Sequence, residues 1–328
     1  MAVYTKMLPE DIEMVVHQYQ IGLVHRYQEI SAGIENTNYF LTTRIDFAGN
    51  SGKKQLQEWV LTIFENLVPD DLPYFCHLTE HLAKDGFDVP APIKTRRDEY
   101  LFSFNDKVGV IVPKLSGHSL IRPSSDDCAQ LGCYLAKMHL SLGEFSSFKP
   151  LVRGVEWMKQ QSERLKGVMP SDDFTLLKYY LARYRSYSAD LLTCPQGTVH
   201  GDLFRDNVLF DKGKVSGVFD FYHACDATLL FDLAVIANDW CTVDGSLDLE
   251  KREKLVSAYQ SIKPWTEEEV DMWENCLELA ALRFWLSRLV SFYLPGYQQK
   301  SLLGETLKDP AEMKAILLTL HRPQSDSC

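Results

Sequence analysis

The chain has 328 residues, a formal net charge of −11 and a composition that is 45% hydrophobic and 24% charged. Its length suggests about two domains or lobes, and the balance is that of an ordinary globular protein rather than a disordered one. An acidic chain has no general attraction to nucleic acid or to an anionic membrane surface, so we expect neither as a partner. An anionic ligand must therefore be held by local groups and a metal ion.

The cysteine pattern and the start of the chain favour a cytoplasmic protein. The eight cysteines include no CxxC pair and have no zinc-type spacing. The N-terminal stretch MAVYTKMLPEDIEMVV lacks the basic region and apolar core of a signal peptide. The longest apolar stretch, residues 227–237, is interrupted by Asp232 and is too short to span a membrane. We expect thiols that are mostly packed in the core.

The first third of the chain is predicted to form strands with one helix. Residues 30–47 and 58–64 are rich in β-branched and aromatic residues, which predicts an antiparallel hairpin with a long tip at 47–55. Two more strands are expected at 100–104 and 108–112, joined by a polar turn. These strands indicate a small antiparallel sheet.

Helical patterns dominate after a short segment at 113–117. Before it, apolar residues at helical spacing predict one helix from Leu72 to a stop at Gly86. We place a hinge at about 113–117, between an N-terminal lobe of residues 1–112 and a C-terminal lobe of residues 113–328. Helix starts in the second lobe are predicted at Ser171, at Thr266 with capping-box spacing, and at Asp309-Pro310.

Within residues 198–226, TVHGDLFRDNVLFDKGKVSGVFDFYHACD, acidic residues alternate with strand formers. Strands at 208–210 and 215–219, joined by a turn, form a predicted hairpin that brings Asn207 and Asp220 to the same open end. Asp202 lies five residues before Asn207, so the preceding loop can deliver its carboxylate to that end.

An aspartate and an asparagine carbonyl suit Mg²⁺, which keeps sites for water and phosphate oxygens. A second aspartate can then accept a proton from an attacking hydroxyl, as phosphoryl transfer requires. The alternative interpretation is a structural hairpin with polar ends, the commoner role of a single acidic turn.

The catalytic motif carries a resemblance to a known superfamily. Residues 200–207, HGDLFRDN, resemble the HxDxxxxN catalytic loop of the aminoglycoside phosphotransferase and choline kinase superfamily, relatives of protein kinases. Within it, five blocks resemble the bacterial homoserine kinase family in order along the chain: ISAGIENTNYFLTT (30–43), VLTIFE (60–65), VHGDLFRDNVLF (199–210), DFYHACDATLLFDLAVIANDWC (220–241) and LRFWLSRL (282–289).

The resemblance implies an α+β, bilobal, protein-kinase-like fold. A small antiparallel sheet with one helix forms its N-lobe, and a larger, mainly helical C-lobe carries the catalytic hairpin. The implied reaction is ATP- and Mg²⁺-dependent phosphorylation of L-homoserine to O-phospho-L-homoserine in threonine biosynthesis. By resemblance Asp202 is the catalytic base, Asn207 and Asp220 hold Mg²⁺, and His200 fixes the loop backbone.

The resemblance also implies a nucleotide site in the first lobe. Small and polar residues in a strand–turn–strand allow backbone N–H groups to approach phosphate oxygens. Most relatives place a phosphate-binding Lys where this chain has Thr62. Either backbone groups and the metal bind phosphate here, with Lys53 or Lys54 as substitutes, or the chain is a nucleotide-binding pseudokinase. The candidates are Ser31, Gly33, Asn36, Asn38 and Thr62.

A small amino acid needs a cation for its carboxylate and an anion for its ammonium group. For the cation we rank Arg205 and Arg283 above Arg288. The alternative for Arg283 and Arg288 is an ion pair on a helix with Glu278 or a neighbouring residue. The other candidate contacts are Asp226 and Asp239 for the ammonium group, Trp240 and Trp285 as walls, and Tyr222 beside Asp220.

Three points stay open from the sequence. The acceptor is a small molecule, either an amino acid or another hydroxyl compound such as choline, an aminoglycoside or an amino alcohol. The protein is a monomer or a homodimer. Asp226 and Asp232 are alternatively structural, and His139 is interpreted as a buried hydrogen-bonding group.

Overall fold

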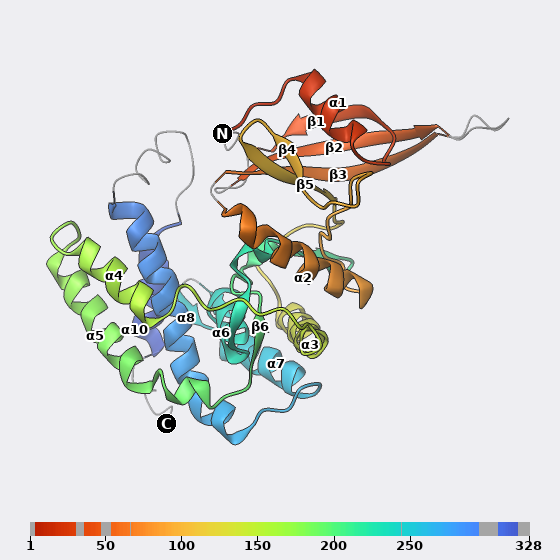
Figure 1. The fold of residues 1–328 in the computed structure, drawn as a ribbon. Coiled ribbons are helices and arrows are strands. Elements are labelled where there is room, and N and C mark those ends of the chain that lie inside the picture. Colours follow the sequence, from red (N-terminus) through yellow and green to blue (C-terminus); the bar gives the residue numbers. More distant parts are fainter. Residues whose placement is uncertain are drawn as a thin grey trace. The chain divides into compact units, whose positions relative to one another are not determined.

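The computed structural model describes residues 4–30, 36–46, 54–65, 67–243, 245–294 and 308–320. The chain divides into two compact units, the first reaching Ser116 and the second beginning at Gly117 (Figure 1). The predicted lobes, 1–112 and 113–328 with a hinge at about 113–117, remain our proposal for the functional division.

The first unit contains a five-stranded antiparallel sheet with the order β1-β2-β3-β5-β4. The predicted hairpin is confirmed, because β2 and β3 pair from Asn36 opposite Phe64 to Asp46 opposite Lys54. Its strands and helices are α1 (Pro9–His17), β1 (Leu23–Glu29), β2 (Asn36–Asp46), β3 (Lys54–Phe64), η1 (Pro69–Asp71), α2 (Leu72–Lys84), β4 (Phe102–Phe104) and β5 (Lys107–Pro113).

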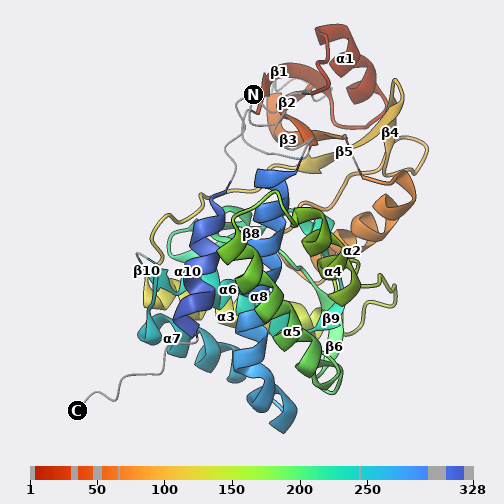
Figure 2. The same cartoon turned by 90° about the vertical axis from the view of Figure 1, so that its left-hand side faces the viewer.

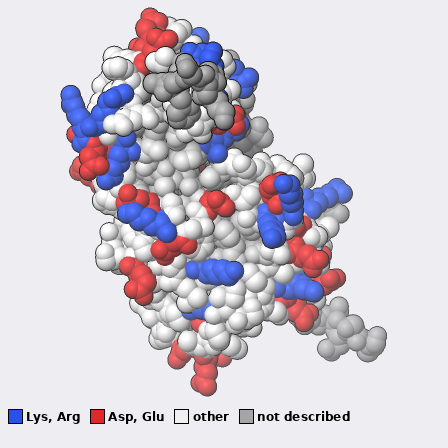
Figure 3. All heavy atoms as spheres, turned by 90° about the vertical axis from the view of Figure 1, so that its right-hand side faces the viewer, with Lys and Arg blue, Asp and Glu red and all other residues white. Residues whose placement is uncertain are grey.

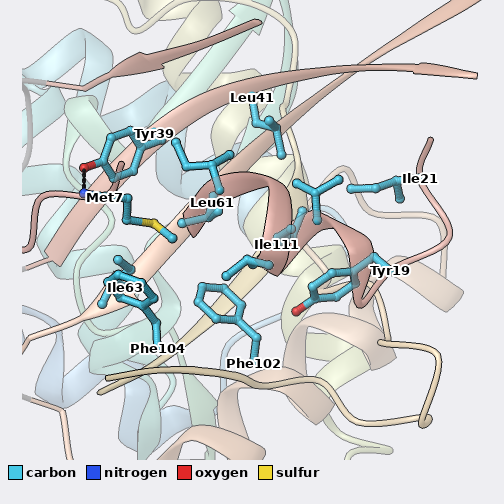
Figure 4. Close-up of a cluster of buried hydrophobic side chains, with 13 residues drawn as sticks. Met7, Tyr19, Ile21, Tyr39, Leu41, Leu61, Ile63, Phe102, Phe104 and Ile111 are labelled. Atoms are coloured by element: carbon cyan, nitrogen blue, oxygen red, sulfur yellow. Dashed lines mark hydrogen bonds between the residues drawn. The ribbon is translucent and has the colours of Figure 1, made fainter. Parts of the chain in front are cut away.

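One face of this sheet packs against α1, whereas the sequence predicted only one helix in this part of the chain. Alternate residues along the strands, such as Leu61 and Ile63 on β3, are buried in this core (Figure 4). The hydroxyl oxygen of Tyr39 accepts a hydrogen bond of 3.0 Å from the backbone N–H of Met7, just before the helix (Figure 4). The expectation of a single helix is therefore wrong.

The second unit is mainly helical. Its predicted helix starts are confirmed: α5 begins at Ser171, Thr266 forms a capping box at the start of α8, and α10 begins at Pro310. Figures 1 and 2 show α4, α5, α8 and α10 side by side, with α8 also contacting α6. The helices are α3 (Ser125–Leu142), α4 (Val155–Leu165), α5 (Ser171–Tyr187), α6 (Leu230–Trp240), α7 (Leu249–Gln260), α8 (Glu267–Tyr293) and α10 (Pro310–Leu320).

Three two-stranded ladders complete the second unit. They pair β6 (Gln196–Val199) with β9 (Cys225–Thr228), β7 (Val208–Asp211) with β8 (Lys214–Val218), and β10 (Thr242–Val243) with β11 (Ser246–Leu247). Short 3₁₀ turns are η2 (Asp190–Leu192), η3 (Arg205–Asn207) and η4 (Phe221–His223).

The described residues contain no helix that is both long and apolar enough to cross a membrane. On the face drawn in Figure 3, acidic and basic side chains are scattered over a mostly uncharged surface, with several red and blue groups next to one another.

Candidate active site

The start of the loop at residues 200–207 is held by a buried carboxylate of α6. Asp232 Oδ2 accepts a hydrogen bond of 2.7 Å from the backbone N–H of His200, and its Oδ1 accepts one of 2.8 Å from that of Gly201. His139 Nε2 lies 3.3 Å from the same Oδ2, and its Nδ1 lies 2.9 Å from the Tyr259 hydroxyl oxygen. The interpretation of His139 as a buried hydrogen-bonding group is confirmed, and Asp232 has the structural role expected for it.

The rest of the loop is held by residues about two turns further along the same face of α6. Asp239 Oδ2 accepts a hydrogen bond of 2.8 Å from the backbone N–H of Arg205, and Trp240 Nε1 donates one of 3.2 Å to the carbonyl of Leu203. Seven residues separate Asp232 from Asp239, about two helical turns, so both carboxylates lie on the same face. One helix thus fixes the loop backbone at both ends.

His200 links this loop to the end of β8. Its Nδ1 accepts a hydrogen bond of 3.2 Å from the backbone N–H of Asp202, so Nε2 carries the proton and donates to the carbonyl of Phe219 at 3.0 Å. Burial lowers the pKa of the imidazole, which keeps it neutral and preserves this tautomer. These hydrogen bonds hold the loop backbone, which is the role that the resemblance implies for His200.

The β7–β8 hairpin has the predicted arrangement at its open end. Val208 pairs with Val218, and the backbone N–H of Phe219 donates a hydrogen bond of 3.1 Å to the carbonyl of Asn207. Asp220 follows with φ 67° and ψ 55°, a left-handed conformation that aspartate tolerates better than most residues. Asn207 and Asp220 therefore leave the hairpin at the same end.

Asp202 has the environment of a general base. Asn207 Nδ2 donates hydrogen bonds to its Oδ2 at 3.0 Å and to its backbone carbonyl at 2.8 Å. Burial raises the pKa of the Asp202 carboxyl to about 6, and the nearby charges of Arg283, Lys308 and Arg153 act in the opposite direction. A carboxylate with a pKa near the working pH is suited to accept a proton in catalysis.

The two oxygen ligands fit a hard divalent cation. Because Asn207 donates through Nδ2 to Asp202, its Oδ1 is the atom suited to coordinate a cation, beside the carboxylate of Asp220. No group of three His, Cys, Asp or Glu side chains that could hold a metal ion occurs in the described part of the chain. An ion with few protein ligands, completed by water and phosphate oxygens, matches this donor set.

Two of the residues predicted to bind opposite ends of the substrate instead bind each other. Arg205 Nε lies 3.1 Å from Asp239 Oδ2, Nη2 lies 3.3 Å from Oδ1, and Nη1 donates to the carbonyl of Ile121 at 2.8 Å. The expectation that Arg205 holds a substrate carboxylate and Asp239 an ammonium group is corrected, because each charge is neutralised by the other.

The predicted tryptophan walls are core residues. Trp240 and Trp285 have 0% exposed surface, and the Trp240 ring packs against Phe210 with centroids 5.8 Å apart. A fully buried ring has no surface to offer a ligand. The expectation that Trp240 and Trp285 form walls of the substrate site is therefore wrong.

The remaining substrate candidates divide between the site and the scaffold. Arg283, on α8, is 5% exposed. Its charge is the largest of those that oppose the effect of burial on the pKa of the Asp202 carboxyl. Arg288 Nη1 binds Glu312 Oε2 at 2.8 Å and so joins α8 to α10. Tyr222 is half-buried in η4, and Asp226 holds a neighbouring loop.

Two cations whose charges act on Asp202, Lys308 and Arg153, are not among the residues predicted from the sequence. Arg153 precedes α4 and is far in sequence from every motif. Glu278, which was considered as an ion-pair partner on α8, has its carboxylate oxygens 3.1 and 3.2 Å from Arg183 Nε on α5.

In the first unit, Thr62 and Asn38 form a neutral pair on facing strands. Thr62 Oγ1 donates a hydrogen bond of 2.7 Å to Asn38 Oδ1, and Asn38 Nδ2 donates one of 3.3 Å to the carbonyl of Asn36. Lys54 begins β3 eight residues before Thr62, about 26 Å along the strand, so it does not take the place of a lysine at Thr62. Ser31, Gly33 and Lys53 lie outside the described residues.

Asp202, Asn207 and Asp220 at one end of a hairpin on this α+β scaffold form an arrangement suited to phosphoryl transfer, which indicates a phosphotransferase with a protein-kinase-like fold. The model of the phosphotransferase enzyme family, the aminoglycoside phosphotransferase group, matches residues 26–265, and the chain belongs to that family. The predicted fold class and superfamily are confirmed.

Relatives of known activity extend over nearly the whole chain. The chain is 40% identical to the homoserine kinase of Cupriavidus pinatubonensis over 303 residues, covering 90% of each chain. It is 37% identical to the homoserine kinase of Ralstonia pickettii over 344 aligned positions, covering 99% of each.

Solved structures share the fold at low sequence identity. An amicoumacin kinase in complex with AMP-PNP, Ca²⁺ and Ami has a TM-score of 0.68 at 15% identity, covering 93% of this chain and 92% of that one. A microcompartment-associated aminopropanol kinase has a TM-score of 0.68 at 15% identity, covering 95% and 96%.

Proposed function

We propose that the protein transfers the γ-phosphoryl group of ATP to the side-chain hydroxyl of L-homoserine, giving O-phospho-L-homoserine and ADP in threonine biosynthesis. The observation that carries the proposal is the placement of Asp202, half-buried and hydrogen-bonded to Asn207 at the open end of the β7–β8 hairpin. The near full-length similarity to two homoserine kinases supports the acceptor.

In the proposed reaction, Asp202 orients the homoserine hydroxyl and receives its proton as the oxygen forms a bond to the γ-phosphorus. The bond between that phosphorus and the bridging oxygen of ADP breaks, so ADP leaves with its electron pair. Asn207 keeps the Asp202 carboxylate in place through Nδ2. His200 and Asp232 hold the loop backbone and take no part in bond making.

We assign Asn207 Oδ1 and Asp220 as ligands of Mg²⁺, which neutralises phosphate charge when bound with the nucleotide. In the first unit we propose Ser31, Gly33, Asn36, Asn38 and Thr62 as nucleotide contacts. A neutral Thr62–Asn38 pair leaves phosphate charge to backbone N–H groups and the metal ion. Tyr222 and Arg283 remain proposed contacts of the acceptor.

We infer a cytoplasmic enzyme, since the substrate and ATP are small cytosolic molecules and the seven cysteines that are described are free thiols. The oligomeric state, monomer or homodimer, stays a prediction.

The test is release of ADP by the purified protein with homoserine, serine, threonine, choline or an aminoglycoside as acceptor. We expect turnover with homoserine well above the other acceptors. Asp202→Asn keeps the shape of the side chain and removes the base, so it should abolish turnover and leave binding of Mg·ATP intact. ADP release that no hydroxyl compound stimulates contradicts the proposal.

The second candidate is a nucleotide-binding pseudokinase, which Thr62 favours because the superfamily resemblance implies a phosphate-binding lysine at this position. It predicts binding of Mg·ATP with equal, background ADP release by the wild type and Asp202→Asn. The same pair of proteins therefore separates the two functions.

A further inference from the structure

The acceptor's own geometry limits where its carboxylate can bind. In homoserine four bonds join the hydroxyl oxygen to the carboxylate carbon, so these atoms lie about 5 Å apart when the chain is extended. With the hydroxyl at Asp202, the cation that binds the carboxylate must lie within this short radius. Arg205 follows Asp202 closely in sequence but is occupied by Asp239 and the carbonyl of Ile121.

Arg283 is one cation in the right place. It projects from α8 and is 5% exposed, with its guanidinium carbon 4.1 Å from the centroid of the Phe284 ring. The Phe284 ring in turn meets the ring of Phe204, in the catalytic loop, edge to face at 4.5 Å. The position of Arg283 beside the loop is therefore fixed by packing within α8 and against the loop.

Arg153 is brought to the same region by a loop that is pinned to β9. Asp226 Oδ2 accepts a hydrogen bond of 2.7 Å from the backbone N–H of Lys149, and the backbone N–H of Asp226 donates one of 2.7 Å to the carbonyl of Lys149. Pro150 forms a parallel bridge with Asp226. Arg153 follows three residues later, with its guanidinium carbon 5.7 Å from the Trp157 ring centroid.

His223 lies beside the start of the catalytic loop. It precedes Asp226 by three residues, and its carbonyl oxygen lies 2.8 Å from the position of a Cβ built on Gly201. Burial, followed by the charges of Arg153 and Arg283, lowers the pKa of its imidazole well below the usual value. The charges of both guanidinium groups thus act on one ring, which lies beside the catalytic loop.

We propose that Arg153 and Arg283 together bind the carboxylate of the amino-acid acceptor, and that the Asp226 contact with Lys149 positions Arg153 for this role. The assignment rests on the proposed function and gives it a determinant of specificity, since an amino alcohol without a carboxylate gains nothing from these residues.

The test compares wild type with Arg153→Met on L-homoserine and on 3-aminopropan-1-ol, which is homoserine without its carboxylate. Losing one charge-assisted contact should raise the KM for homoserine by roughly 10- to 150-fold. The KM for ATP and kcat/KM for 3-aminopropan-1-ol should stay within about threefold, because neither involves the carboxylate. Arg153→Lys keeps the charge and should recover part of the loss.

Arg164→Met is the matched control, because Arg164 is exposed on α4 and binds only Gln161 among the contacts described. We expect it to behave as wild type. An Arg153→Met enzyme whose KM for homoserine is unchanged overturns the proposal. A raised KM for ATP, or an equal loss on both acceptors, also overturns it, since the arginine then serves the transferred phosphate.

Failure of the proposed function has a different signature. If the wild-type enzyme phosphorylates another acceptor and does not use homoserine, the proposed function is wrong, and no variant is needed to show it. A wild type that uses homoserine, with an arginine variant that matches it, leaves the proposed function intact and rejects only the carboxylate site.

Discussion

Replacing Asp232 by Asn tests whether α6 positions the catalytic loop. The carboxylate is fully buried and accepts the backbone N–H groups of His200 and Gly201, one on each oxygen. Asparagine has nearly the same shape but only one acceptor oxygen. Its amide nitrogen must therefore face a second donor, either one of these N–H groups or the ring of His139.

The expected cost follows from these contacts. A hydrogen bond to a charged group contributes about 1.5–3 kcal/mol, and a neutral one about 0.5–1.5 kcal/mol. Losing one charged bond and weakening the other gives a destabilisation of about 2–4 kcal/mol. Domains of ordinary stability, about 5–15 kcal/mol, remain folded after such a loss.

Urea unfolding followed by far-UV circular dichroism measures the first effect, and kcat for homoserine measures the second. We expect a lower urea midpoint and at least roughly a tenfold fall in kcat, because the loop that carries Asp202 is no longer fixed. Asp211→Asn is the control, since Asp211 is exposed at the hairpin turn. Equal midpoints and equal kcat for Asp232→Asn and Asp211→Asn refute the positioning role.

Two further predictions concern the loop glycine and the metal. Gly201→Ala, at φ +78°, should lose about 1–2 kcal/mol of stability from the left-handed backbone and more from a clash with the His223 carbonyl. Gly213→Ala, at φ +73° with nothing within 4 Å, should lose only the backbone contribution. Similar urea midpoints and similar kcat values for the two variants contradict this prediction. Chelation by EDTA should abolish turnover, and Mg²⁺ should restore it, without moving the urea midpoint of the nucleotide-free protein, because Asn207 already binds Asp202 directly. Full turnover in EDTA excludes the assignment of Asn207 and Asp220.

The parts of the fold that the sequence predicted are those with a local cause. The capping box at Thr266 and the turn between β7 and β8 each depend on a few residues that are close in sequence. A single sequence is therefore enough to predict them. Helix α1 also had a local signal, since Ile12, Val15 and Val16 are spaced for one helix face after Pro9. The elements predicted above nevertheless do not include this helix, because the same stretch was considered only as a possible signal peptide.

The substrate side of the site depended on information that is not local. Sequence chemistry identified arginines and aspartates as suitable groups, but it does not say which charges neutralise each other. Arg205 and Asp239 lie 34 positions apart and form an ion pair, and the loop that precedes Arg153 is bound by Asp226, 77 positions beyond Lys149. Such pairings are decided by tertiary packing.

Asp232 illustrates how burial turns a residue type into a structural inference. It lies in an apolar run of α6 in which every residue is buried. A buried carboxylate without partners costs several kcal/mol, so an aspartate in such a run implies nearby donors that satisfy it. Here the donors are backbone N–H groups of the catalytic loop, which donate their hydrogen bonds to Asp232 of α6 in the absence of any ligand. The base is thereby held in position in advance, as electrostatic catalysis of phosphoryl transfer requires.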